Sequence, residues 1–254
     1  MTVQFAVRGV LLDIEGTTSS IRFVHDEMFP YARRGLRPYL AERWGGRALE
    51  RGLDVIARDA GHPSLAGWCA GLSDDASRDR VAAHVERLMD ADSKATGLKA
   101  LQGLIWESGF RGGALRAHLY EDVEPALRAW ALAGIDVRIY SSGSVQTQRL
   151  FFAHTIAGDL SPLLRGHFDT TTGAKKAPES YTTIAAAYDL PPTQLLFISD
   201  VADELDAAQR AGFRTALSQR PENPPVPVGV GHPRIGGFGD VVMTDIPYRD
   251  APKG

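Results

Sequence analysis

Two patterns of apolar and polar residues divide the chain. Residues 7–13 form a short apolar run that ends in an aspartate and is followed by the turn-forming sequence EGTTSS, which predicts a buried strand. From about residue 24 to residue 118, apolar positions instead recur at helical spacing. From about residue 121 onward, helical and strand-like segments alternate. This order predicts a parallel sheet with helices on both faces, and a helical insertion after the first strand.

Turn residues and helix caps place the boundaries of these elements. In the helical stretch we expect helices that include residues 37–44, 79–92 and 94–110, with breaks at Gly45-Gly46, Gly61-His62-Pro63 and Gly112-Gly113. In the alternating stretch we expect helices over 121–134, 144–154, 178–190 and 202–213, and strands over 135–143 (running into a turn), 166–170, 194–200 and 214–218. The predicted fold is an α/β, doubly wound, Rossmann-like core of residues 1–19 and 119–254, interrupted by a helical domain of residues 20–118.

Composition narrows the function classes. The 254 residues are 44% hydrophobic and 23% charged, which is ordinary for a globular protein and excludes disorder for most of the chain. Lys and Arg number 28 against 31 Asp and Glu, a net charge of −3 that argues against a nucleic-acid-binding protein. The single cysteine, Cys69, suits a reducing compartment, and no apolar run approaches the roughly 18 residues of a membrane span. We therefore expect a cytoplasmic monomer with no nucleic-acid or membrane partner.

Polar residues gather where the predicted strands end, which is where open parallel sheets bind ligands. Asp13 ends the first strand, with Glu15 two residues later. The sequence Ser141-Ser142-Gly143 ends the next strand and leads into a helix, and Asp200 ends another strand, with Glu204 following. Lys175 and Lys176 lie in the loop before the helix that starts at Pro178.

These residue types together favour phosphoryl transfer. Carboxylates gathered at one sheet edge are the ligands that Mg²⁺ prefers. A lysine, a serine and the helix start after Ser142 can hold phosphate oxygens. An aspartate facing a phosphorus centre can then act as nucleophile through an aspartyl-phosphate. Each motif alone is weak, because strand-end acids, helix caps and surface lysines are common; their joint order carries the prediction.

Other catalytic motifs are absent from the sequence. The seven histidines form no H-x-x-x-H pair, so a zinc site is not expected. The chain contains neither a G-x-S-x-G nucleophile elbow nor a G-x-x-x-x-G-K-[ST] phosphate loop.

The four elements in this order resemble the haloacid-dehalogenase (HAD-like) superfamily of aspartate-nucleophile phosphotransferases. Residues 11–32, 139–152, 166–181 and 196–213 are more closely similar to the bifunctional enolase-phosphatases, or acireductone synthases, of methionine salvage. Residues of about 45–110 match that family only in length and helical character. The resemblance implies a HAD core with an inserted helical cap.

The resemblance also implies roles for the residues. Asp13 would be the nucleophile and a metal ligand, and Asp200 a further metal ligand. Glu15 stands where most superfamily phosphatases have Asp, and would be a metal-associated catalytic residue acting through its side chain or its backbone carbonyl. Ser141 and Ser142 would bind substrate. Lys175 would bind the phosphate and take part in catalysis.

Neighbouring residues have expected roles as well. Lys176 sits one place late to be the functional lysine, and Glu204 would orient water on a single Mg²⁺ per subunit. The base that removes the carbon-bound proton stays open between Glu15 and His25. Aromatic residues at the start of the insertion, for instance Phe23, Phe29 and Tyr31, would either contact a methylthio group or simply pack the cap.

The implied activity is conversion of 2,3-diketo-5-methylthiopentyl 1-phosphate to the acireductone 1,2-dihydroxy-3-keto-5-methylthiopentene and phosphate. Three alternatives remain open. The first is a capped phosphatase of another small phosphate ester, without an enolase step. The second is a metal-independent dehalogenase, against which Glu15 and Asp200 speak. The third is a phospho-accepting signalling module, in which the long insertion has no place.

Overall fold

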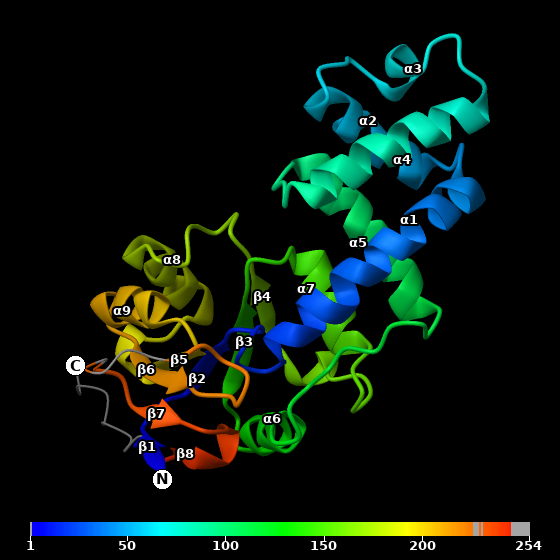
Figure 1. The fold of residues 1–254 in the computed structure, drawn as a ribbon. Coiled ribbons are helices and arrows are strands. Elements are labelled where there is room, and N and C mark those ends of the chain that lie inside the picture. The colour runs from blue at the N-terminus through cyan, green and yellow to red at the C-terminus, as the bar shows by residue number, and fades with distance from the viewer. Residues whose placement is uncertain (1, 226–228, 230, 245–254) are drawn as a thin grey trace. The chain divides into compact units, whose positions relative to one another are not determined.

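The computed structural model describes residues 2–225, 229 and 231–244 (Figure 1). Contacts divide the chain into two compact units, Met1–Phe23 with Arg116–Gly254, and Val24–Leu115. The last residues of the predicted core, 245–254, lie outside the described residues.

A parallel sheet forms the centre of the first unit. Within the described residues it has six strands in the order β4-β3-β2-β5-β6-β7, all parallel. The chain runs outward from β2 to β3 and β4, then returns to β5 and continues to β6 on the other side. The carboxyl ends of β2 and β5 therefore lie at the switch point of the sheet, where α/β folds bind ligands. The strands are β2 (Gly9–Leu12), β3 (Asp136–Tyr140), β4 (Gly166–Phe168), β5 (Leu195–Ser199), β6 (Arg214–Ser218) and β7 (Arg234–Ile235).

This sheet confirms the predicted fold class, because its strands are parallel and both of its faces are covered. All four residues of β2 and all five of β5 are buried, as continuous apolar strands between two helical layers should be. The helices of this unit are α6 (Val123–Leu132), α7 (Val145–Ala153), α8 (Pro178–Tyr188) and α9 (Ala202–Arg210). A second, two-stranded parallel sheet pairs β1 (Val3–Phe5) with β8 (Val241–Met243), a pairing that the sequence did not predict.

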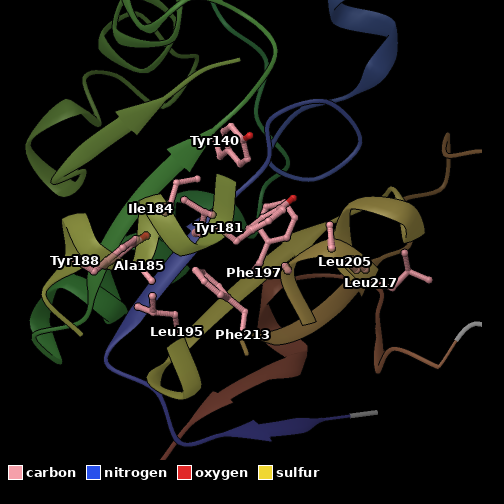
Figure 2. Close-up of a cluster of buried hydrophobic side chains, with 13 residues drawn as sticks. Tyr140, Tyr181, Ile184, Ala185, Tyr188, Leu195, Phe197, Leu205, Phe213 and Leu217 are labelled. Carbon is pink, nitrogen blue, oxygen red and sulfur yellow. The ribbon is translucent and has the colours of Figure 1, made fainter. Parts of the chain in front are cut away.

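Helices α8 and α9 lie side by side over one face of the sheet (Figure 1). Between them and the sheet lies a cluster of buried apolar side chains, with Tyr181 from α8 and Phe197 from β5 near its centre (Figure 2). Their rings lie 5.2 Å apart. This layer fixes α8, and with it the loop that carries Lys175.

The second unit is helical throughout, apart from its connecting loops. Its helices are α1 (Phe29–Arg43), α2 (Arg47–Asp59), α3 (Leu65–Trp68), α4 (Asp74–Asp90) and α5 (Thr96–Arg111). The predicted breaks are confirmed: α1 ends before Gly45, α2 ends before Gly61 and α5 ends before Gly112. The apolar faces of α2 and α5 pack together so closely that a side chain at Gly97 would meet the backbone of Ile56 at 2.7 Å.

Short turns complete the described elements: a π-helical turn, η1 (Phe23–Met28), and 3-10 turns η2 (Ser161–Leu163), η3 (Pro192–Gln194) and η4 (Phe238–Asp240). Among the described residues, no helix combines the length and apolar character needed to cross a bilayer.

Candidate active site

Asp13 follows β2 at the switch point and is 5% exposed. Its backbone N–H donates to the carbonyl of Ile198 on β5 (3.0 Å), which continues the sheet by one residue. The chain then turns sharply, and the N–H groups of Thr17, Thr18 and Ser19 all donate to the carbonyl of Ile14. The Ile14 N–H also donates to Asp13 Oδ1 at 2.8 Å, so the turn itself orients the carboxylate.

Lys175 reaches this carboxylate from the loop before α8. Its Nζ lies 2.8 Å from Asp13 Oδ1 and 2.7 Å from Glu204 Oε2. Ser199 Oγ donates to Glu204 Oε2 at 3.1 Å and completes the group. Burial alone would lower the pKa of Lys175, but attraction to Asp13 and Glu204 outweighs it and raises the pKa. The ammonium group is therefore charged at neutral pH.

Asp200 adds a third acidic group where β5 ends. Burial, followed by repulsion from Asp13 and Glu204, raises the pKa of Asp200 to about 7 despite the attraction of Lys175. The pKa of Glu204 is raised as well, first by burial and then by Asp13. Negative charge at this edge thus exceeds what Lys175 neutralises, and a bound cation would relieve the excess.

Side-chain oxygens at this edge could supply some, but not all, of the ligands of a hard divalent cation. Within the part of the chain that the structure describes, no group of three His, Cys, Asp or Glu side chains is arranged to hold a metal ion. Asp13 and Asp200 come from adjacent strands, and Glu15 lies half-buried two residues after Asp13, in a bridge with Ser19. Mg²⁺ commonly binds through one or two carboxylates and keeps several waters, so this donor set fits that ion.

Gly16 follows Glu15 and contacts Asp200. Its φ is +67°, in the left-handed region that favours glycine. A Cβ at this position would lie 2.3 Å from Asp200 Oδ2. Only glycine therefore lets the turn pass against the Asp200 carboxylate, a requirement that sequence reasoning missed although the Asp-x-Glu-Gly order was visible.

The serine motif lies on the neighbouring strand end. Ser141 is buried after β3, whereas Ser142 is exposed. Helix α7 then begins with Ser144 as its N-cap, accepting from Thr147 N–H, while Asp169 Oδ2 accepts from Val145 N–H at 3.1 Å. Two first-turn N–H groups are thus already bonded within the protein. Both N–H groups lie at the helix start that was predicted to bind phosphate, and substrate binding by Ser141 and Ser142 stays a prediction.

Tyrosine and serine side chains hold the Lys175 loop by its backbone. Tyr181 OH donates to the Lys175 carbonyl at 2.7 Å, and Ser180 Oγ donates to the Ala174 carbonyl at 2.8 Å. Tyr140 OH donates to the Gly173 carbonyl at 2.9 Å. Figure 2 shows both tyrosines in the cluster beneath α8. Sequence reasoning missed these three residues, although Tyr140 adjoins the serine motif and Tyr181 lies in the first turn of a predicted helix.

The remaining predicted residues lie in different settings. Lys176 is 64% exposed and pairs with Asp203 on the surface. Phe23 is 3% exposed and packs edge-on against Phe151, which favours the packing role over a substrate contact. His25, Phe29 and Tyr31 belong to the helical unit, and their roles stay predictions.

Several known proteins are similar to this chain in sequence and in fold. Residues 7–212 match the haloacid dehalogenase-like hydrolase family. The chain is 44% identical to the enolase-phosphatase E1 of Stenotrophomonas maltophilia over 240 residues, covering 93% of this chain and 99% of that protein. It is also 44% identical to the enolase-phosphatase E1 of Synechococcus elongatus, covering 90% of this chain and 95% of that protein.

Solved structures agree with the sequence comparison. The UTR4 protein of Saccharomyces cerevisiae has a TM-score of 0.76 and 30% identity, covering 91% of this chain and 98% of that one. A dehalogenase with a TM-score of 0.52 and 18% identity shares the fold alone. The chain therefore belongs to the haloacid dehalogenase-like hydrolases and, within them, to the enolase-phosphatase E1 family.

Proposed function

We propose that this protein is a Mg²⁺-dependent enolase-phosphatase of methionine salvage. It would convert 2,3-diketo-5-methylthiopentyl 1-phosphate to 1,2-dihydroxy-3-keto-5-methylthiopentene and phosphate. The observation that carries the proposal is the buried group of Asp13, Lys175 and Glu204 beside Asp200, at the switch point of the sheet. The 44% identical relatives named enolase-phosphatase E1 support the substrate.

Asp13 is the nucleophile in this proposal. Its Oδ1 accepts from the Ile14 N–H and from Lys175, whereas within the described part of the chain Oδ2 has a single neighbouring donor, the Ser199 hydroxyl at 3.4 Å, which lies closer to Glu204. Oδ2 is therefore the less engaged oxygen and attacks phosphorus, breaking the bond to the substrate oxygen. Water then hydrolyses the aspartyl-phosphate and regenerates the carboxylate. Lys175, Ser141 and Ser142 would hold the phosphate oxygens throughout.

Asp13 and Asp200, with Glu15, would hold one Mg²⁺ per subunit. That ion, when bound, supplies Lewis-acid stabilisation of negative charge on phosphoryl and enolate oxygens. Holding the phosphate also fixes the carbon chain for removal of its acidic proton. Glu15 and His25 remain the candidate bases for that step.

The helical unit, Val24–Leu115, would act as the cap that excludes water during the reaction. We further propose a cytoplasmic monomer without nucleic-acid or membrane partners, which the charge balance and the single cysteine support.

A two-channel assay of the diketo phosphate tests the function. One channel follows ultraviolet absorbance of the conjugated enol and the other follows free phosphate, with Mg²⁺ present and oxygen excluded. We expect both signals from the wild type, their loss with chelator, and loss of phosphate release in Asp13→Asn. Cleavage of simple phosphate esters without an enol signal would favour the alternative, a capped phosphatase of another small ester. Activity of more than a few per cent in Asp13→Asn would overturn the role of Asp13.

A further inference from the structure

The loop that follows β6 holds the turn that follows β2 by its carbonyl groups. Three successive carbonyls of the turn, those of Gly16, Thr17 and Thr18, each accept a hydrogen bond from outside it. The Thr18 carbonyl accepts from the Tyr120 N–H at 3.1 Å. The other two carbonyls accept from side chains of the last residue of β6 and of the loop that follows it.

The Gly16 carbonyl has two side-chain donors. Ser218 Oγ donates to it at 3.0 Å, and Asn223 Nδ2 donates at 2.9 Å. Asn223 Nδ2 also lies 3.2 Å from the Ser218 carbonyl, so the two donors are tied to each other. Two donors on one buried carbonyl fix the orientation of the peptide group between Gly16 and Thr17.

Arg220 holds the next carbonyl from a rigid position. Its Nε donates to the Thr17 carbonyl at 3.0 Å, and its Nη1 contacts both carboxylate oxygens of Asp122, at 2.8 and 3.0 Å. The guanidinium lies 4.3 Å from the ring of Tyr120 and 5.2 Å from the ring of Phe238. With 6% exposure, Arg220 is locked in place and keeps the turn attached.

Gly16 connects these hydrogen bonds to the acidic end of the sheet, because its backbone lies against the Asp200 carboxylate. The position of a Gly16 Cβ lies 2.3 Å from Asp200 Oδ2 and 2.9 Å from Asn223 Oδ1. Asp200 Oδ2 and Asn223 Oδ1 therefore lie on the same side of the Gly16 Cα, and the Asn223 amide also holds the Gly16 carbonyl. A rotation of the Gly16 peptide would change the surface against which that carboxylate rests.

We propose that Ser218 and Asn223 are positioning residues for the cation site: by fixing the Gly16 peptide, they set the placement of Asp200 relative to Asp13. This inference rests on the proposed function, since it assumes a cation between those two carboxylates. Residues that orient metal ligands from outside typically change metal affinity 10- to 100-fold when removed.

The test is calorimetric titration of the metal-free protein with MgCl₂. The double variant Ser218→Ala/Asn223→Ala removes both donors to the Gly16 carbonyl while Arg220 keeps the turn attached. We expect Mg²⁺ binding about 10-fold weaker or more. In the phosphatase assay, the Mg²⁺ concentration for half-activation should rise by a similar factor, with kcat largely restored at saturating Mg²⁺.

The matched control is Thr215→Val. Thr215 lies on the same strand, and its buried hydroxyl bonds His232 Nδ1 at 2.9 Å rather than a carbonyl of the turn. This variant should lose stability but keep wild-type Mg²⁺ affinity. Equal weakening in Thr215→Val, or unchanged affinity in the double variant, would overturn the proposal. If the double variant does not fold, the single variants decide in the same way, and wild-type affinity in both overturns it.

A wild type that shows no Mg²⁺ binding would contradict the proposed metal site itself, and is thereby distinguished from failure of the positioning role.

Discussion

Nζ of Lys175 lies 2.8 Å from Oδ1 of Asp13, and both side chains are nine-tenths buried or nearly so. The same ammonium group also neutralises Glu204 at 2.7 Å. One buried cation thus serves two buried carboxylates, and its removal would leave both without their partner.

Lys175→Ala should therefore reduce stability as well as activity. Breaking a buried ion pair from one side typically costs about 3–5 kcal/mol, because an uncompensated charge stays buried. Lys176→Ala is the matched control, since that side chain pairs with Asp203 on the surface, where ion pairs contribute little. Urea denaturation and phosphate-release kinetics measure both effects. A larger loss in Lys176→Ala would show that the functional lysine has been assigned one position too early.

Gly16→Ala should lower activity more than its backbone strain alone explains. A non-glycine residue in the left-handed region costs about 1–3 kcal/mol. The new Cβ would in addition displace the Asp200 carboxylate, from which it would be 2.3 Å away. Gly134→Ala is the control: its φ of +74° is similar, and nothing lies within 4 Å of its added Cβ. Comparable stability losses with activity lost only in Gly16→Ala would support this prediction. Equal activity in the two variants would contradict it.

Tyr181→Phe should loosen the Lys175 loop. The variant removes the hydrogen bond to the Lys175 carbonyl, leaving a buried acceptor that costs about 1–3 kcal/mol. We expect KM for the phosphate ester to rise more than kcat falls. Tyr188→Phe removes a similar bond, from a buried hydroxyl to the Val10 carbonyl at 2.8 Å, away from that loop. Stability should fall in both variants, and a raised KM in Tyr188→Phe would argue against a specific role for Tyr181.

His167 should make folding sensitive to acid. Burial, together with the charge of Arg149, lowers the pKa of His167 to about 4 from its ordinary 6.5. The unfolded chain therefore takes up a proton near pH 6.5 that the folded protein resists until about pH 4. Stability from the neutral ring is complete above pH 6.5 and is lost as pH falls through this window. Urea unfolding measured across this pH window should show that the free energy of unfolding declines less steeply in His167→Gln than in the wild type. Parallel pH profiles would refute this prediction.

The sheet edge could be predicted because its residues follow apolar runs. Asp13, Ser141 and Asp200 each come directly after a strand, and parallel strands place such residues at one edge. The breaks between helices could be predicted too, because glycine and proline residues mark them in the sequence. Helix α2 carried an equally clear signal, since Leu49, Leu53 and Ile56 recur on one face between two predicted breaks, although no residue range was predicted for it.

The contacts that orient these residues could not be predicted, because no local sequence pattern marks them. Ser218 and Asn223 bind a backbone carbonyl more than 200 residues away in sequence, and such bonds depend on the path of a loop rather than on residue spacing. The pairing of β1 with β8 is likewise too distant in sequence for local patterns to reveal. The hydrogen bond from the Val145 N–H in the first turn of α7 to Asp169 also depends on how β4 and α7 pack, which local sequence patterns do not reveal.

The order of strands in the sheet also sets when its central strands can pair during synthesis. Strand β2, which leads to Asp13, is translated before the helical unit, but its neighbours β3 and β5 are translated only after that entire unit. Because domains fold as they emerge, the helical unit can fold while β2 still lacks both partners. Under the proposed function, the nascent chain would be inactive until Lys175 and Asp200 have emerged. The pairing of β1 with β8 then joins a strand that precedes the helical unit to one that follows it.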